Sequence, residues 1–121
     1  MSDEVVIITK NSIFTVALNK KRLALSHAGM RNLPTNIGKL TELTELDLFK
    51  NKLTNLPKSI GNLKNLKMLD AGRNKLNYLP ESIGNLTKLV SLSLDRNEMI
   101  SLPESIGNLS NLVSLDLFQN K

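Results

Sequence analysis

The chain of 121 residues has no cysteine, no tryptophan and a single histidine, His27. Without cysteine it can hold neither a disulfide framework nor a cysteine-ligated metal site. It also lacks the HExxH, GxSxG and glycine-rich phosphate-loop motifs that mark common catalytic and nucleotide sites. These absences predict a protein that is not an enzyme, with no cofactor and no metal. His27 is interpreted as a surface residue, because a lone imidazole has no catalytic partner.

Aromatic residues and long apolar runs are equally scarce. Aromatic residues make up 3% of a chain that is 40% hydrophobic, so the core must be aliphatic, which suits a stacked repeat. Residues 1–4 read Met-Ser-Asp-Glu and supply no basic start to a signal peptide, and the apolar run VVII is far too short to span a bilayer. We therefore expect no membrane span and a cytoplasmic location, or delivery by a bacterial export system that needs no classical signal peptide.

The net charge of +5 is unevenly distributed. Residues 1–39 hold six Lys and Arg against two acids, a net +4, and residues 40–121 hold ten against nine, a net +1. The cluster Lys20, Lys21 and Arg22 is interpreted as a solvated basic face; the alternative is docking on acidic lipid or nucleic acid. Acids interleave with the bases of the repeats, whereas nucleic acid favours an uninterrupted basic stripe. The sequence predicts a protein partner and no nucleic acid.

What the chain does have is a repeat of 23 residues. The segment LKNLKMLDAGRNKLNYLPESIGN at 63–85 recurs in related form at 40–62 and at 86–108. A period of this length indicates a solenoid, in which each repeat is one coil stacked on the next. The predicted organisation is an N-terminal cap (1–16), a degenerate first repeat (17–39), three full repeats (40–108) and an incomplete fifth repeat (109–121).

Each repeat contains the signals for one turn of the coil. Leu46-Asp47-Leu48 alternates apolar and polar residues, which indicates a strand with one buried face. Strands that return every 23 residues must be parallel, because the crossover is long. An asparagine follows each full strand, and we expect its amide to bond backbone groups of the turn and of the adjacent coil. This structural asparagine ladder consists of Asn51, Asn74, Asn97 and Asn120.

The other side of each coil carries a proline and a glycine four residues later. Pro57 presets the backbone for a short helical turn, and we expect Gly61 to end that turn in the left-handed conformation. In the cap, residues 12–19 are predicted to form a helix with Ser12 at its start, the alternative being two short strands joined by a turn. At the other end, Leu115 and Leu117 lack a following cap. The chain is predicted to be a fragment of a longer solenoid, and the alternative is self-association through this open end.

The motif LxxLxxLxLxxNxLxxLPxxIGx, spread over residues 17–121, resembles the leucine-rich repeat family. Its LPxxIG segment is similar to the 23-residue intracellular class of Ras-group, plant and bacterial members. The resemblance implies an α/β solenoid, a right-handed superhelix with a parallel β-sheet on its concave face and short helical turns or loops on its convex face. It also implies an interaction module. The alternative is the targeting or substrate-recognition segment of a larger enzyme or bacterial effector, since such repeats are often joined to catalytic domains.

The side chains that the strands expose form columns on the concave face, and they vary most from repeat to repeat. We therefore predict that they bind the partner: Glu45, Asp47, Phe49, Lys50, Met68, Asp70, Arg73, Asp95, Arg96, Asp116 and Phe118. The two phenylalanines are either binding anchors or rings that cover the neighbouring column. Lys50, Arg73 and Arg96 are predicted to pair with nearby aspartates, the alternative being phosphate or carboxylate binding. The aligned aspartates are interpreted as structural partners of these bases and not as a metal site.

Overall fold

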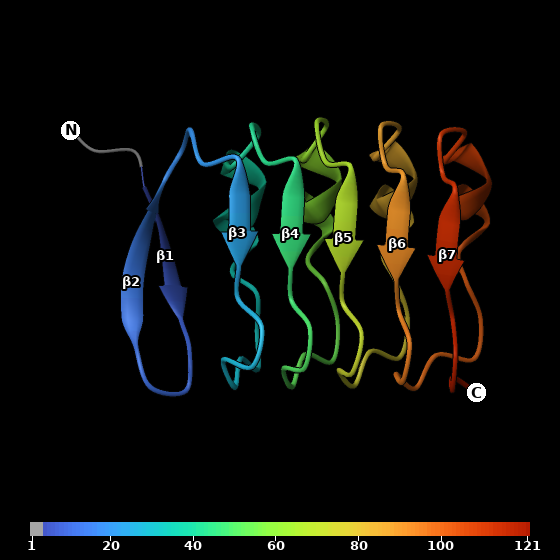
Figure 1. Ribbon diagram of the computed structural model, residues 1–121, viewed down its shortest axis with the longest axis horizontal. Coiled ribbons are helices and arrows are strands. Elements are labelled where there is room, and N and C mark those ends of the chain that lie inside the picture. Colours follow the sequence, from blue (N-terminus) through green and yellow to red (C-terminus); the bar gives the residue numbers. More distant parts are fainter. Residues whose placement is uncertain (1–3) are drawn as a thin grey trace.

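The computed structural model describes residues 4–121 as a row of coils with a parallel sheet along one side and short helices along the other (Figure 1). The strands are β1 (Glu4–Ile8), β2 (Ile13–Ala17), β3 (Arg22–Ala24), β4 (Glu45–Asp47), β5 (Met68–Asp70), β6 (Ser91–Ser93) and β7 (Ser114–Asp116). The 3₁₀ helices are η1 (Thr35–Lys39), η2 (Lys58–Asn62), η3 (Glu81–Asn85) and η4 (Glu104–Asn108). The predicted solenoid, with its parallel sheet and short helical turns, is confirmed.

The sheet contains five parallel strands in the order β3-β4-β5-β6-β7. Neighbouring strands pair in the register of the repeat, so Leu46 lies beside Leu69 and Leu69 beside Leu92. These three leucines are fully buried, and the residues on either side of each one point to the opposite face of the sheet. One repeat therefore places the same positions side by side in every strand.

The core is aliphatic throughout. In the coil that begins at Leu40, the seven inward positions are at most 3% exposed: Leu40, Leu43, Leu46, Leu48, Leu53, Leu56 and Ile60. None of the described aromatic residues belongs to the buried core cluster. The period explains this, because a column of leucines fills the interior with identical layers and leaves no irregular space for a ring.

Each coil is hydrogen-bonded to the preceding one through its buried asparagine. The Asn74 Oδ1 accepts a hydrogen bond from Leu53 N at 3.0 Å, and its Nδ2 donates to Leu48 O at 2.9 Å and to Ala71 O at 3.1 Å. Asn51 makes the same kind of contacts with the first coil, where Ala28 stands in place of an asparagine and donates its own N–H to Asn51 Oδ1 at 3.1 Å. The polar groups of the turn are thereby satisfied inside the protein.

The repeated glycine has a different role from the one predicted. Gly29 is the single glycine with a positive φ among residues 4–121, so Gly61 does not end η2 in the left-handed conformation. A Cβ at Gly61 would instead lie 2.6 Å from Ser82 O and 2.7 Å from Ser82 Cβ in the next coil. The glycine is required because adjacent coils approach closely here. The Ser82 hydroxyl donates to Lys58 O at 2.7 Å and bridges the same two coils.

The cap is an antiparallel hairpin, and the predicted helix over residues 12–19 is wrong. Strands β1 and β2 pair with Ile7 opposite Phe14, and the hairpin buries Val5, Ile7 and Val16 on the first coil. Ser12 lies in the connecting turn, where its N–H bonds Thr9 Oγ1 at 3.0 Å and its carbonyl accepts the Thr9 N–H at 2.8 Å. Burial alternates along β1, whereas β2 buries Val16 alone and is held by its pairing with β1.

At the other end of the described sheet, Leu115 and Leu117 of the last coil are 39% and 37% exposed. Self-association through this surface stays a prediction.

Candidate functional site

The predicted site residues lie along the exposed side of β4 to β7 and on the turns that follow these strands. Glu45 and Met68 begin β4 and β5, and Asp47 and Asp70 end them, in matching register. Met68 is exposed. Glu45 forms an ion pair with Arg22, in which Arg22 Nε lies 3.3 Å from Glu45 Oε2. The sheet therefore brings side chains that are far apart in the sequence into continuous rows.

The turn after each strand of the parallel sheet, β3 to β7, contains a left-handed residue. His27, Lys50, Arg73, Arg96 and Gln119 have φ values of 55°, 57°, 51°, 54° and 56°. Non-glycine residues seldom adopt this conformation, so its recurrence in five coils indicates that the surrounding structure enforces it. The sequence analysis missed this feature. Its signal is the aspartate that stands three residues before most of these positions.

The aspartates hold these turns through the backbone. Asp47 Oδ1 accepts a hydrogen bond from Phe49 N at 3.0 Å, and Asp70 and Asp116 accept the equivalent N–H two residues later at the same distance. In the coil where a serine replaces the aspartate, the Ser93 hydroxyl donates to Asp95 Oδ1 at 3.0 Å. The predicted partners of these aspartates are therefore wrong, because the carboxylates accept backbone N–H groups of their own turns and do not pair with the neighbouring bases.

Together these carboxylates form an acidic row across the sheet. Burial raises the pKa of the Asp70 carboxyl, the hydrogen bond from Gly72 N–H lowers it, and the charges of Asp47, Asp95 and Asp116 raise it again, for a net increase. Burial of the carboxyl is the main cause of the raised pKa, and the neighbouring carboxylates add to it.

The cations beside the row contact rings. The Arg73 guanidinium carbon lies 5.8 Å from the centroid of the Phe49 ring, and that of Arg96 lies 6.0 Å from the Phe118 centroid. The ion pairs among residues 4–121 are Lys21–Glu42, Arg22–Glu45 and Lys121–Glu98, so the predicted pairing of Lys50, Arg73 and Arg96 with aspartates is wrong. The aspartates accept backbone N–H groups of the turns instead. Arg73 reaches a ring of the preceding coil and Arg96 a ring of the following coil.

The two phenylalanines differ in exposure. Phe49 is half-buried, with the His27 ring on one side at a centroid distance of 5.7 Å and Arg73 on the other. Phe118 is 61% exposed and contacts Arg96. Between these two Arg–Phe pairs the column contains Gly72, where a Cβ would overlap the Asp95 carboxylate. Gly72 is therefore buried beneath the Asp95 carboxylate, which takes the space that a side chain at this position would need.

Two members of the basic cluster Lys20, Lys21 and Arg22, which precedes and begins β3, form ion pairs with the next coil. Lys21 Nζ lies 2.7 Å from Glu42 Oε1, and Arg22 pairs with Glu45. Within the part of the chain that the structure describes, no group of three or more acidic or histidine side chains is arranged to hold a metal ion. None of the helices in residues 4–121 is long and apolar enough to cross a bilayer.

Comparison with known proteins identifies the architecture. A family model described as a leucine-rich repeat region matches residues 34–121. A leucine-rich repeat protein of Leptospira interrogans is 46% identical, with a TM-score of 0.83 over 84% of this chain and 26% of the other. The ectodomain of the receptor kinase GASSHO1/SCHENGEN3 of Arabidopsis thaliana, in complex with CASPARIAN STRIP INTEGRITY FACTOR 2, is 32% identical with a TM-score of 0.79, over 87% of this chain and 13% of the other.

Internalin C2 of Listeria monocytogenes is 29% identical with a TM-score of 0.77, over 85% of this chain and 44% of the other. The chain thus spans less than half the length of each of these three structures. A search of curated protein sequences finds no match. The family match and the repeated coil agree, and the chain belongs to the leucine-rich repeat family.

Proposed function

We propose that this chain is a non-catalytic binding module that holds a protein partner against its concave face. The observation that carries the proposal is the pair of Arg–Phe contacts on the concave face, Arg73 with Phe49 and Arg96 with Phe118. Arg73 and Arg96 have no carboxylate partner among the described residues, and each lies over a ring instead. Aromatic and arginine side chains dominate the binding energy of protein interfaces, so this region is equipped to anchor a partner.

The acidic row next to these contacts adds selectivity. A partner segment with a basic side chain would place it near Asp70 and Asp95. Charge complementarity of this kind mainly governs partner choice and association rate. The Arabidopsis ectodomain, which has a similar fold, was solved in complex with CASPARIAN STRIP INTEGRITY FACTOR 2, and this supports a binding role for such a fold.

The test is an affinity capture that compares the parent chain with the triple variant Phe49→Ala, Arg73→Ala, Phe118→Ala. A matched control variant, Lys75→Ala, Tyr78→Ala, Ile100→Ala, removes one cation and two exposed apolar side chains from turns and loops outside the concave columns. We expect the triple variant to lose a captured protein that the parent and the control retain. Far-UV circular dichroism and melting must match among all three. Equal capture by the triple variant would refute binding through this face.

A second candidate is that the module recognises targets for a longer protein. The chain spans 26% of the Leptospira structure and 13% of the receptor-kinase ectodomain, so repeats like these occur within larger chains. Sequencing the gene beyond codon 121 tests this candidate, because a catalytic domain encoded there would support it and a stop codon would exclude it.

A further inference from the structure

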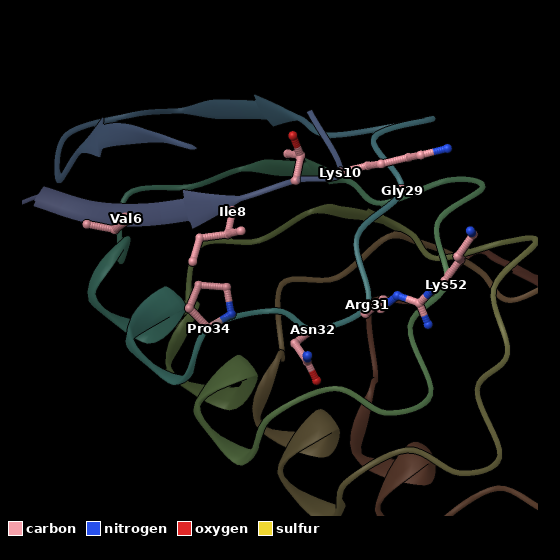
Figure 2. Close-up of a pocket in the computed structure, with 9 residues that line it drawn as sticks. Val6, Ile8, Lys10, Gly29, Arg31, Asn32, Pro34 and Lys52 are labelled. Carbon is pink, nitrogen blue, oxygen red and sulfur yellow. The ribbon is translucent and has the colours of Figure 1, made fainter. Parts of the chain in front are cut away.

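A cavity of about 590 Å³ lies between the β1–β2 hairpin and the first coil, outside the concave columns. Its walls come from β1 and the residues after it, from residues 29–34, and from Lys52 of the next coil. Figure 2 shows Val6, Ile8 and Pro34 on one side of the cavity and the cationic side chains of Lys10, Arg31 and Lys52 together on the other. The cavity thus combines an apolar wall with a basic one.

The apolar wall is also an open strand edge. Thr9 N–H donates across the hairpin to Ser12 O, whereas Lys10 N–H donates in the opposite direction to Ala28 O of the first coil, at 2.9 Å. Successive N–H groups of a strand point to alternate sides, so Val6 and Ile8 direct their N–H groups toward the same side as Lys10. Within residues 4–121, β1 pairs with β2 alone. The edge of β1 that faces the cavity can therefore accept another strand.

The basic wall has no acid to balance it. The cavity lining contains no aspartate or glutamate, and none of the three ion pairs of residues 4–121 includes Lys10, Arg31 or Lys52. The approach of Lys10 to the first coil depends on Gly29, which has a φ of 64° and where a Cβ would lie 2.6 Å from Lys10 Cβ. The fold thus holds three cations around an apolar recess in which Val6 and Ile8 remain 45% and 61% exposed.

We propose that this cavity binds an extended acidic peptide segment of a protein partner. The segment adds as a strand to the open edge of β1, which is a recurrent mode of peptide recognition. Its apolar side chains contact Val6, Ile8 and Pro34, and its carboxylates lie near the three cations. The recess and the hydrogen-bonding edge suit a single extended chain better than a flat lipid surface, and the lining offers no aromatic ring on which a base would stack.

The experiment titrates the full chain into a short fluorescent peptide of alternating glutamate and valine. Two control peptides replace glutamate by lysine, or carry N-methyl groups that remove backbone donors. The variant Arg31→Glu, Lys52→Glu reverses the basic wall, and Lys58→Glu, Lys64→Glu makes the same change of net charge outside the cavity. Melting curves verify that both variants fold. Hydrogen exchange of the Val6 and Ile8 amides reports strand addition at the β1 edge.

We expect the Arg31/Lys52 variant to bind the acidic peptide about tenfold more weakly or worse, and the Lys58/Lys64 variant to change affinity less than about threefold. The peptide should slow exchange at Val6 and Ile8, and both control peptides should fail to bind. The proposal would be overturned if both variants lost the same affinity for the acidic peptide, or if a control peptide bound as tightly. It would also be overturned if the peptide slowed hydrogen exchange only in β4–β6, or if no binding were seen at millimolar peptide. Binding to phosphatidylserine vesicles that the Arg31/Lys52 variant alone abolishes would overturn it as well, since the occupant would then be a lipid surface.

Discussion

Replacing Asn74 by alanine tests how far the coils depend on the buried asparagines. The Asn74 side chain belongs to a residue that is 7% exposed, and its Oδ1 is the acceptor for Leu53 N–H. The carbonyls to which its Nδ2 donates keep other amide donors, because Asn51 also bonds Leu48 O and Asn97 also bonds Ala71 O. The alanine variant therefore leaves one buried N–H unsatisfied, together with a small cavity.

The expected cost follows from these two losses. A buried donor without a partner costs about 1–3 kcal/mol, and with the cavity the free energy of unfolding should fall by about 2–4 kcal/mol. For a chain of this size that lowers the melting temperature by about 6–15 °C. The assay is urea unfolding at constant temperature, followed by far-UV circular dichroism. The dependence of the unfolding free energy on urea concentration must be the same in variant and parent, because only then does a shift in midpoint give the change in free energy.

The control is Asn120→Ala. Asn120 accepts from Met99 N at 3.1 Å but is only partly buried, so water can replace its amide. Its loss should cost less than about 1 kcal/mol. If Asn74→Ala costs no more than Asn120→Ala, burial of the N–H groups is not what makes the asparagines stabilising.

Three further substitutions probe the coil contacts, the acidic row and the turns. Gly61→Ala should destabilise by about 1–3 kcal/mol because its Cβ meets Ser82, whereas Gly107→Ala, where a Cβ would have no neighbour within 4 Å, should be neutral; equal melting would contradict this. Burial raises the pKa of Asp70, so folding stability is lost as the pH rises through the folded-state pKa and this carboxyl ionises. Asp70→Asn should therefore melt at a higher temperature than the parent at neutral pH and at the same temperature in acid. A difference in melting temperature that does not change with pH would refute this pH dependence. Lys50→Gly should stabilise by about 0.5–1 kcal/mol by relieving a φ of 57°, and a lower unfolding midpoint would oppose this.

The repeat alone was sufficient to predict the solenoid, the parallel sheet and the inward leucines. Each of these depends on a signal that recurs every 23 residues, and a local ambiguity in one coil is resolved by the others. The hairpin lies outside the repeat, and this is why residues 12–19 were predicted incorrectly. An apolar segment of that length fits a strand or a helix equally well, and only the exposed side of the first coil selects between them.

The candidate site was predicted less completely than the fold. The exposed positions could be read from the register, but the pattern of basic residues does not indicate that Arg73 and Arg96 contact rings instead of aspartates. It does not indicate the left-handed turns either. The same turn explains why Asp47 bonds a backbone N–H in preference to a base. The cavity at β1 could not be predicted, because it joins residues 6–10, residues 29–34 and Lys52, which share no spacing or motif.

The nearly identical packing of successive coils makes the length of this molecule adjustable. Gly61 packs against Ser82 of the next coil much as Gly84 packs against Ser105, so successive coils make equivalent contacts with their neighbours. Duplicating residues 63–85 would extend the sheet by one strand spacing, about 4.8 Å, without a new kind of contact in the core. It would also repeat Arg73 and Gly72 and move Phe118 one step further from Phe49. Gene duplication can therefore alter the spacing of the exposed binding residues while the packing of the coils that support them stays the same.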